Sequence, residues 1–400
     1  MLEHSAMRAT LIADDLTGAC DAGAPFAGRG PVGVFISPAS PGPEWSVAVV
    51  DTESRGRSPA DARDAVRAAA SRLGARFNPG LLFKKIDSTL RGPTGAEVDA
   101  LLAASGRRTA LLCPAFPGQG RMVVNGVLLV NGTRAHESSI ARDPTYPGPT
   151  SDVAEIIRRG TARSVSRLPL HRVRGDADAL AMILRDAKDQ IVVADALTDG
   201  DLAALACATL HWPEMVLAGS AGLAGAVAEA YGHAGAPAPL PGGRAWLIVA
   251  GSAQPATRAQ LRSLEAGGVL GARLDAPTDP DTGPLVERLK GGHPVFIATS
   301  DTLATGLDAR RATGARLAAL AARILTDSRP DLIAVTGGET ATALLHAIGA
   351  TRLEVSGAPS NGLALVDAIV DSTSKWPLLT KAGGFGPPDL FTSLLAGHRS

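Results

Sequence analysis

Short runs of aliphatic residues alternate with alanine-rich helical patterns along the whole chain, and this alternation constrains the fold most strongly. Such runs suit strands buried on both faces, and helical crossovers between them imply parallel pairing. The predicted strands are Ala9–Ala13, Val47–Val50, Leu81–Ile86, Thr109–Cys113, Ile191–Ala194, Met215–Ala218, Ala245–Ala250, Pro294–Ala298, Leu332–Val335 and Pro377–Thr380. The predicted helices include Pro59–Leu73, Glu97–Ala104, Leu180–Ala187, Leu202–Leu210 and Arg310–Leu325. The sequence therefore predicts an α/β fold.

One segment, Tyr231–Gly243, has neither a strand nor a helix period. It consists mainly of Gly, Ala and Pro, which suit neither a helix nor a central strand, so it is typical of a linker. A long surface loop inside one domain is the alternative. We predict two domains, residues 1–235 and 244–400, each a largely parallel sheet flanked by helices.

A second irregular stretch covers residues 114–149 and interrupts the strand–helix alternation. Within it, the apolar piece Met122–Val130 has the pattern of a hairpin, and Asn131-Gly132 is expected to close it because Asn-Gly favours tight turns. We expect this stretch to be an insertion between two parallel units.

Composition excludes several classes of function. Lys plus Arg and Asp plus Glu number 39 each, so the formal net charge is zero, and aromatic residues are only 4%. The chain therefore lacks the basic field and the stacking surface of a nucleic-acid or membrane-surface binder. The three cysteines are widely spaced, which argues against a disulfide framework and for the reducing cytoplasm. No apolar run approaches the ~18 residues of a membrane helix.

Two adjacent acids, Asp14 and Asp15, follow the first predicted strand and precede a predicted helix. In open α/β sheets, ligands bind where strands end and helices begin. Paired carboxylates there can bind a hydrated cation or accept a proton from a substrate hydroxyl. Simple capping of the helix is the alternative. Because capping needs only one residue, the pair favours a catalytic role.

A dense polar segment, residues 84–95, follows the third predicted strand and precedes a helix. Its candidate binding residues are Lys84, Lys85, Asp87, Ser88 and Arg91. Backbone N–H groups at the helix start, together with Arg91 and a lysine, suit a carboxylate or phosphate. A solvated turn is the alternative, and the density of polar groups argues against it.

Three glycine-containing loops follow strands of the second half of the chain. Their candidate anion-binding residues are Ser252, Gly337, Gly338, Glu339, Thr340 and Gly383. Glycines let the backbone approach an anion, and a helix N-terminus favours negative charge, so the loops suit one phosphate-bearing ligand. Neither the P-loop motif of NTPases nor the GxGxxG fingerprint of dinucleotide-binding folds is present.

These motifs together resemble the four-carbon acid sugar kinases, which phosphorylate threonate, erythronate or 3-oxo-tetronate with ATP. The matching segments are IADDLTGACD at 12–21, KKIDSTLRGPTGAE at 84–97, PAFPGQGR at 114–121, VNG at 124–126, DPTYP at 143–147, GSAGLA at 219–224, GS at 251–252, TGGET at 336–340 and KAGGFG at 381–386. In the last of these, Ala382 and Gly384 replace the Ser and Asn of the family's KSGNFG pattern. Backbone contacts from this loop are expected to survive that difference.

The resemblance implies that the N-terminal domain binds the acid sugar and the C-terminal domain binds ATP, with the active site in the cleft between them. It implies ATP contacts for Ser252, Gly337, Gly338, Glu339, Thr340 and Gly383, and an acid-sugar pocket lined by Asp14, Asp15, Lys84, Asp87, Ser88 and Arg91. Small-molecule partners and a cytoplasmic location are the remaining expectations, and a homodimer is the assembly considered, because symmetric dimers are the commonest oligomers.

We therefore predict a phosphotransferase with an alcohol group as acceptor, acting on the terminal (4-) hydroxyl of D-threonate, D-erythronate or 3-oxo-tetronate. Arg91, helped by Lys84 or Lys85, is expected to bind the substrate carboxylate. One of the two aspartates, either Asp14 or Asp15, is expected to orient the hydroxyl and accept its proton, while Mg²⁺ bridges the ATP phosphates.

Two other functions stay open at this stage. A nicotinamide-dependent sugar-acid dehydrogenase would use the same architecture, although the fingerprint it needs is absent. A non-enzymatic sugar-acid sensor would keep the pocket at residues 84–95 and dispense with ATP, yet the glycine loops of the second domain are retained.

Overall fold

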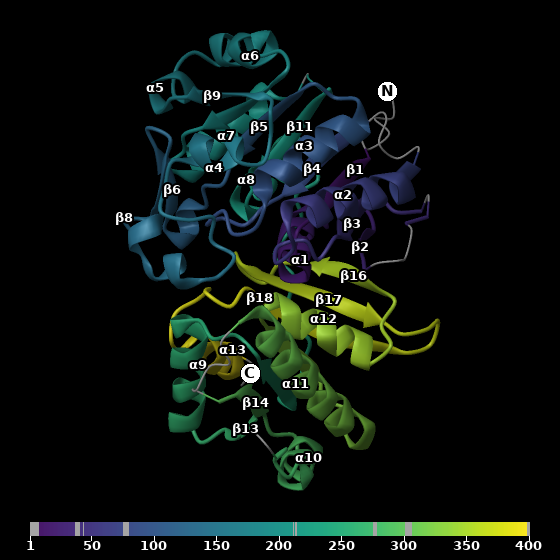
Figure 1. The fold of residues 1–400 in the computed structure, drawn as a ribbon. Coiled ribbons are helices and arrows are strands. Elements are labelled where there is room, and N and C mark those ends of the chain that lie inside the picture. The colour runs from purple at the N-terminus through teal and green to yellow at the C-terminus, as the bar shows by residue number, and fades with distance from the viewer. Residues whose placement is uncertain are drawn as a thin grey trace. The chain divides into compact units, whose positions relative to one another are not determined.

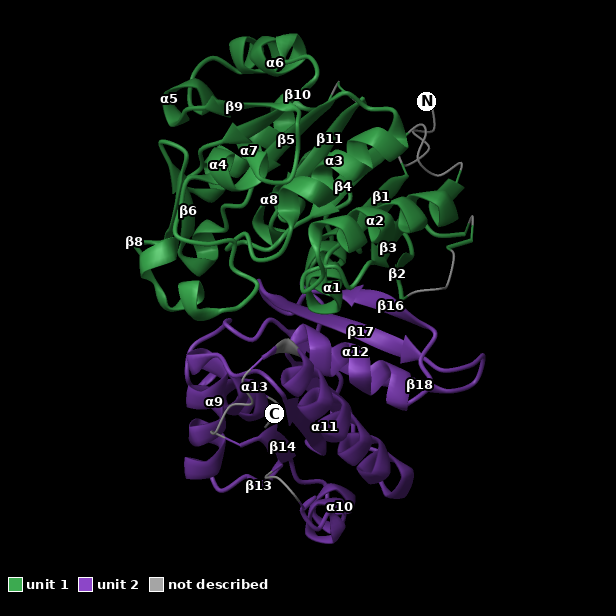
Figure 2. Ribbon diagram, in the orientation of Figure 1, with its two compact units in different colours: residues 1–236 green, residues 237–400 purple. Residues whose placement is uncertain are grey.

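The computed structural model describes residues 8–36, 41–42, 44–74, 80–210, 212, 214–274, 278–300 and 306–397. The chain divides into two compact units, residues 1–236 and 237–400, shown in green and purple in Figure 2. Each unit contains a mainly parallel sheet accompanied by helices, as labelled in Figure 1. The predicted α/β class is confirmed.

The sheet of the first unit is parallel throughout. Its strands are β1 (Ala9–Ala13), β2 (Val32–Phe35), β3 (Val47–Asp51), β4 (Leu81–Lys85), β5 (Thr109–Cys113), β9 (Ser164–Leu168), β10 (Gln190–Ala194) and β11 (Met215–Gly219). Their order is β2-β3-β1-β4-β11-β5-β10-β9. The six strands predicted here are confirmed, each with its ends within one residue of the prediction. The edge strands β2 and β9 were not predicted.

Helices cover both faces of this sheet. They are α1 (Leu16–Gly23), α2 (Pro59–Leu73), α3 (Thr94–Ser105), α4 (Val153–Arg158), α5 (Leu170–Val173), α6 (Ala177–Asp186), α7 (Asp199–Ala208) and α8 (Ala221–Ala230). One row runs α2-α3-α4, and the other runs α1-α8-α7-α6. Strands β1, β3, β4, β5 and β11 are buried along their whole length, as strands covered on both faces must be.

A small antiparallel sheet occupies the stretch predicted as an insertion. Its strands are β6 (Arg121–Val124), β7 (Val127–Val130) and β8 (Thr133–Arg134). The prediction of the closing turn was wrong. Asn125-Gly126 closes the first hairpin, and Asn131-Gly132 instead connects β7 to β8. All four of these residues have positive φ, between 50° and 80°, as the tight turns of hairpins require.

The sheet of the second unit is parallel on one side and antiparallel on the other. Its strands are β12 (Trp246–Ala250), β13 (Leu270–Leu274), β14 (Val295–Thr299), β15 (Leu332–Thr336), β16 (Arg352–Gly357), β17 (Leu363–Ile369) and β18 (Lys375–Lys381). The run β13-β14-β12-β15-β18 is parallel, and β18-β17-β16 is antiparallel. The four strands predicted here are confirmed, while β13, β16 and β17 were not predicted.

The helices of the second unit are α9 (Pro255–Ala266), α10 (Gly283–Lys290), α11 (Leu307–Asp327), α12 (Gly338–Ala347) and α13 (Leu390–Gly397).

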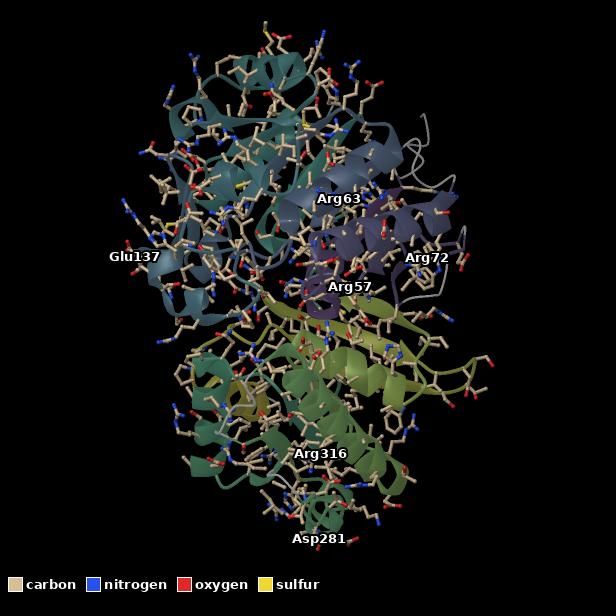
Figure 3. The ribbon with its side chains drawn as sticks, viewed as in Figure 1. Arg57, Arg63, Arg72, Glu137, Asp281 and Arg316 are labelled. Carbon is tan, nitrogen blue, oxygen red and sulfur yellow. The ribbon has the colours of Figure 1, made fainter. Side chains whose placement is uncertain are left out.

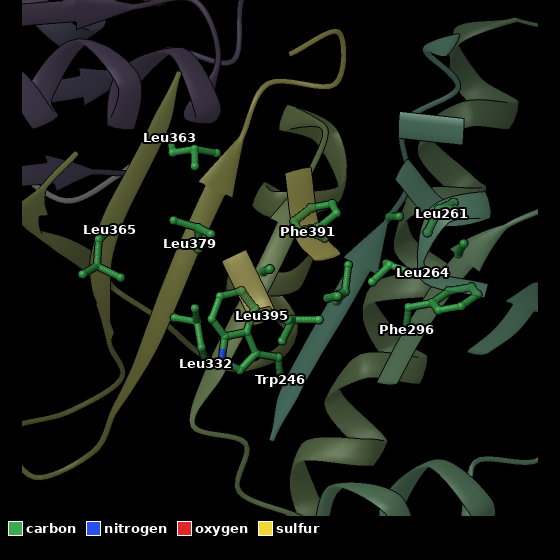
Figure 4. Packing of buried hydrophobic residues seen from close by; sticks show 14 of the residues in the cluster. Trp246, Leu261, Leu264, Phe296, Leu332, Leu363, Leu365, Leu379, Phe391 and Leu395 are labelled. Carbon is green, nitrogen blue, oxygen red and sulfur yellow. The ribbon is translucent and has the colours of Figure 1, made fainter. Parts of the chain in front are cut away.

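The chain has few aromatic residues, and three of them fill the centre of this unit. Trp246, Phe296 and Phe391 are each at most 1% exposed and belong to one buried apolar cluster (Figure 4). This cluster joins β12 and its neighbouring strands to α9 and α13, and it fixes where the loops after those strands begin.

Four of the predicted helices, α3, α6, α7 and α11, begin three residues before the predicted start. In two of them a capping residue marks the true start. In α7, Thr198 and Asp201 form a capping box, and in α6 the Asp176 side chain accepts a hydrogen bond from the Ala179 N–H. In α3 and α11 the N-cap residue makes no side-chain hydrogen bond to the first turn, and the residues of that turn carry no apolar period.

We expect Gly95→Ala to destabilise the first unit by about 1–3 kcal/mol, because a Cβ on Gly95 in α3 would lie 2.1 Å from the carbonyl oxygen of Ile157 in α4. Gly225 in α8 is the control, since nothing lies within 4 Å of a Cβ there. Gly225→Ala should therefore stabilise the helix by up to about 1 kcal/mol. Urea unfolding midpoints of both variants check this, and a shift in the same direction for both would contradict it.

Candidate active site

The loops after β3, β1 and β4 lie together because these strands are adjacent and parallel. Ala13, at the end of β1, is level with Asp51 on one neighbouring strand and with Lys85 on the other. The chain segments that follow, which carry the predicted acids and cations, therefore leave the sheet along one edge.

Arg55, in the loop after β3, holds the aspartate pair and was missed by sequence reasoning. Its Nε and Nη2 lie 2.8 Å from the two carboxylate oxygens of Asp14. Its Nη1 and Nη2 lie 2.6 and 2.7 Å from the oxygens of Asp15. One guanidinium is thus shared by two adjacent carboxylates. One sequence feature could have indicated Arg55: it stands four residues after the end of β3, a buried strand that neighbours β1.

Besides contacting Arg55, one of the two aspartates caps a helix and the other does not. Asp15 is the N-cap of α1 and accepts a hydrogen bond of 2.9 Å from the Gly18 N–H. Asp14 is only 2% exposed and has no capping role. Burial by itself would raise the pKa of Asp14, but the adjacent Arg55 more than offsets this, and the pKa lies below its ordinary value. Capping therefore accounts for Asp15 and leaves Asp14 without a local structural purpose.

Asp87 and Arg91 form a second paired group in the segment after β4. The Nε and Nη2 of Arg91 lie 2.9 and 2.8 Å from the Asp87 oxygens, and Nη1 lies 3.4 Å from Asp143. Burial acts to raise the pKa of Asp87, but Arg91 and then Arg55 lower it well below its ordinary value. Arg55 lies 3.8 Å from Asp87, so Asp14, Asp15, Asp87 and Arg91 belong to one charge network.

The two lysines of the segment have different surroundings. Lys84 is fully buried and lies 3.2 Å from Glu97 of α3, a residue the sequence reasoning did not select. Burial raises the pKa of Glu97 even though Lys84 opposes this. The ammonium of Lys85 donates to the Ile86 carbonyl at 2.9 Å and has no carboxylate within 4 Å among the residues that the structure describes. Ser88, the remaining predicted residue, is half-buried.

In the second unit, the loops after β12, β15 and β18 meet around Ser252. A Cβ built on Gly383 would lie 2.0 Å from the Ser252 hydroxyl oxygen, and one on Gly337 would lie 3.5 Å from Ser252. A Cβ on Gly251 would lie 1.8 Å from the hydroxyl oxygen of Thr340. The structure thus brings the loops predicted to bind phosphate into contact with one another, with glycines where they approach most closely.

The backbone of the loop after β15 presents the N-terminus of α12. Gly337 is the N-cap and has φ of +100°, whereas Gly338 is the first helical residue. Glu339 is exposed and Thr340 is buried in the first turn. The unpaired N–H groups at a helix start and the helix dipole both favour a bound anion.

Lys381, at the end of β18, organises the third loop and was not selected as a site residue. Its ammonium lies 2.9 Å from the Ala382 carbonyl and 3.1 Å from the Phe385 carbonyl, and the side chain is 1% exposed. Burial lowers the pKa of Lys381 to about 7. Because these contacts are to backbone carbonyls, the presence of Ala382 and Gly384 does not disturb them.

Neither a cluster of metal ligands nor a membrane-spanning helix is present among the described residues. No group of three or more His, Cys, Asp or Glu side chains in the described part of the chain is placed to hold a metal ion. Across those same residues, no helix combines the length and the apolar character needed to cross a membrane.

We expect Arg55→Met to destabilise the protein by about 3–5 kcal/mol at pH 7, because it leaves the buried Asp14 carboxylate unpaired. The folded-state pKa of Asp14 is depressed, so the stability that Arg55 supplies is present above about pH 4. It is lost as the pH falls through the folded-state pKa. The difference between variant and wild type should therefore shrink in strong acid. Unfolding midpoints in urea at several pH values provide the measurement.

Arg57→Met is the matched control for that comparison. Arg57 lies on the same loop but is exposed, and its guanidinium binds the Glu53 carbonyl at 2.9 Å (Figure 3). Its substitution should change stability by no more than about 0.5 kcal/mol at any pH. Equal effects of the two substitutions would refute the special role of Arg55.

We expect the stability contribution of Lys381 to rise with pH. Its pKa is about 7 in the folded chain against an ordinary value of 10.5. Between these values the unfolded chain binds the extra proton, so raising the pH favours folding by up to about 1.4 kcal/mol per pH unit. Unfolding of wild type and Lys381→Met at pH 7 and 9 tests this. The rise should be missing in Lys381→Met and retained in Lys375→Met, whose lysine is exposed.

Comparison with known protein families gives two matches that follow the two units. The model of a sugar-binding N-terminal domain matches residues 9–227. The model of a nucleotide-binding C-terminal domain matches residues 247–391. The charge network around Arg55 lies in the first match, and the loops around Ser252 lie in the second.

Curated relatives resemble the chain over nearly its full length. The D-threonate kinase of Salmonella typhimurium is 32% identical, and the match covers 95% of this chain and 96% of the relative. The D-erythronate kinase of Heliobacterium modesticaldum is 31% identical, with 95% and 94% covered. The 3-oxo-tetronate kinase of Burkholderia multivorans is also 31% identical, with 96% of each covered.

Solved structures share the fold at lower identity. A Haemophilus influenzae protein superposes with a TM-score of 0.71 at 20% identity, covering 97% of this chain and 99% of that one. A Salmonella typhimurium protein gives a TM-score of 0.75 at 22% identity, covering 96% and 98%. From the two domain matches and the full-length relatives, the chain belongs to the four-carbon acid sugar kinase family.

Proposed function

We propose that the chain is an ATP-dependent kinase that phosphorylates the terminal (4-) hydroxyl of D-threonate, D-erythronate or 3-oxo-tetronate. Residues 1–235 are assigned to the acid sugar and residues 244–400 to the nucleotide. The observation that carries the proposal is the full-length similarity to kinases of these three substrates, with a polar site in each matched domain.

The charge network of the first unit suits a small, hydroxyl-rich anion. Asp14 and Asp15 present carboxylate oxygens that accept hydrogen bonds from sugar hydroxyls, and Arg55, which contacts both, lowers the pKa of Asp14. Lys85 supplies a positive charge with no carboxylate partner among the described residues. Asp87, Ser88, Lys84 and Arg91 complete the proposed pocket.

The loops of the second unit suit the phosphates of ATP. Gly337 and Gly338 begin α12, whose first turn has backbone N–H groups without partners inside the helix, and Ser252 lies directly beside both Gly337 and Gly383. Glu339 and Thr340 follow in the first turn of the helix. In the third loop, the Lys381 ammonium donates hydrogen bonds to the carbonyl oxygens of Ala382 and Phe385. When protonated, it adds a positive charge near the phosphates.

Mg²⁺ would neutralise phosphate charge when it accompanies ATP. In the described residues no cluster of acidic or histidine side chains is placed to hold it. Such an arrangement fits an ion bound mainly by the nucleotide's own oxygens and by water, as is usual for Mg²⁺ in kinases.

The proposed reaction forms one P–O bond and breaks another. The terminal hydroxyl oxygen of the sugar acid attacks the γ-phosphorus, the bond to the β–γ bridging oxygen breaks, and ADP leaves. The hydroxyl proton passes to the Asp14–Asp15 pair and then to solvent. A low carboxylate pKa is compatible with this role, since phosphoryl transfer depends mainly on positioning and charge neutralisation.

Release of ADP with each of the three sugar acids tests this proposal. We expect turnover with at least one of them in the presence of Mg-ATP, one ADP for each phosphorylated acid. Gly337→Val is the control variant, because a branched side chain is strained at φ of +100° and would stand against Ser252. It should lose ATP binding and turnover while retaining affinity for the acid.

Two results would decide for the other functions. Reduction of a nicotinamide cofactor by the sugar acid would identify a dehydrogenase. Tight binding of a tetronate by folded protein, without ATP binding or turnover, would identify a sensor. Titration with NADH and ATP separates these cases from the kinase.

A further inference from the structure

Arg121 lies at the start of β6, where the chain returns towards the edge of the main sheet. Phe116 and Arg121 pair through two backbone hydrogen bonds of 2.8 and 3.1 Å, which close the short turn between them. This turn follows β5, which neighbours β11, and β11 in turn neighbours β4. Arg121 therefore lies at the same edge of the main sheet as Asp87, which follows the end of β4.

The surroundings of the Arg121 side chain leave its charge without a carboxylate. Its Nη1 donates to the carbonyl of Gln119, and its buried Nε has no hydrogen-bond partner. No carboxylate lies within 4 Å of it in the part of the chain that the structure describes. Burial lowers the pKa of Arg121, while Asp87 acts to raise it and Arg91 to lower it, so the guanidinium is within electrostatic range of both.

The other arginines of the site are already neutralised from within. Arg55 is held by Asp14 and Asp15, and Arg91 by Asp87 and Asp143. A substrate carboxylate would have to compete with these acids for either guanidinium. A buried donor without a partner costs free energy unless a ligand supplies one. Arg121 meets that description.

We propose that Arg121 binds the carboxylate of the sugar acid and thereby sets the preference for acids over neutral sugars. The inference rests on the proposed function and names the residue that recognises the acid group. A guanidinium can bind a carboxylate through two parallel hydrogen bonds, which gives both charge and orientation. Arg91 is then a positioning residue that holds Asp87, not the anchor expected from the sequence.

The test compares acids with neutral analogues in Arg121 variants of the full chain. Each tetronate and the corresponding tetritol, in which the carboxylate is replaced by CH₂OH, are titrated calorimetrically and assayed for ADP release. We expect Arg121→Met to weaken binding of the acid by at least about 30-fold and to leave the tetritol and ATP affinities nearly unchanged. Arg121→Lys, which keeps the charge without the planar fork, should restore part of the loss.

Arg134→Met is the control, because Arg134 lies on β8 of the same small sheet but is exposed, with its Nη1 3.9 Å from a Glu137 carboxylate oxygen. It should leave the acid and tetritol affinities unchanged. Thermal melting verifies that the variants are folded. If Arg121→Met does not fold, Arg121→Lys and Arg121→Gln carry the comparison.

The outcomes separate the inference from the function on which it rests. Unchanged acid affinity in a folded Arg121→Met enzyme with normal turnover would overturn the inference and leave the kinase proposal standing. An equal loss for acid and tetritol would also overturn it, since that indicates a structural role. Arg121-dependent binding of the acid without any turnover would support the inference and remove the kinase proposal.

Discussion

The site in the first unit depends on one guanidinium that is shared by two adjacent carboxylates. Parallel packing of β3 beside β1 puts Arg55 against Asp14 and Asp15, at distances of 2.6 to 2.8 Å. Without that positive charge, burial would act to raise the pKa of Asp14, whereas beside Arg55 the pKa lies below its ordinary value. The order of the strands therefore supplies the counter-charge of the buried acid as well as the positions of the loops.

The same logic extends across the rest of the network. Arg91 is committed to Asp87, and Lys84 to Glu97, so these cations mainly hold acids in place. Near this network, Lys85 and Arg121 carry positive charges that have no carboxylate within 4 Å among the described residues. A site for a small anion needs such charges, because a cation already paired within the protein gains little from a second anion. The pairing pattern thus separates residues that shape the pocket from residues suited to bind the ligand.

The loops of the second unit, which matches a nucleotide-binding domain, pack closely against one another through backbone and small side chains. Glycines stand where its loops touch, at Gly251, Gly337 and Gly383, and a Cβ at the first or the last would collide with a neighbouring hydroxyl. Lys381 supports these loops through backbone carbonyl oxygens and has no carboxylate within 4 Å in the part of the chain that the structure describes. The sequence differences at Ala382 and Gly384 are tolerated for the same reason, since backbone groups make the contacts.

Features of this protein that depend on local pattern could be predicted from the order of its residues. Apolar runs located the central strands to within about one residue, because strands buried on both faces must be apolar throughout. Motifs at strand ends located Asp14, Asp15 and the glycine loops, because chemistry at the carboxyl edge of a parallel sheet requires particular residue types there. Four helix starts were placed one turn late, and the edge strand β9, in which only Val165 and Leu168 are buried, gave too weak a pattern to be recognised.

Only the tertiary structure decided which charges meet. Arg55 and Asp14 are separated by 41 residues in the chain, and no local pattern relates them. Their contact follows from the strand order β3-β1-β4, which several sheet topologies with the same strands would not give. Likewise, Arg91 looked available in the sequence but is paired with Asp87 in the fold, whereas Arg121 begins β6, which follows β5, two strands away from β4. Ionic pairing depends on distances in space, so it was settled by the packing of the strands and not by the order of the residues.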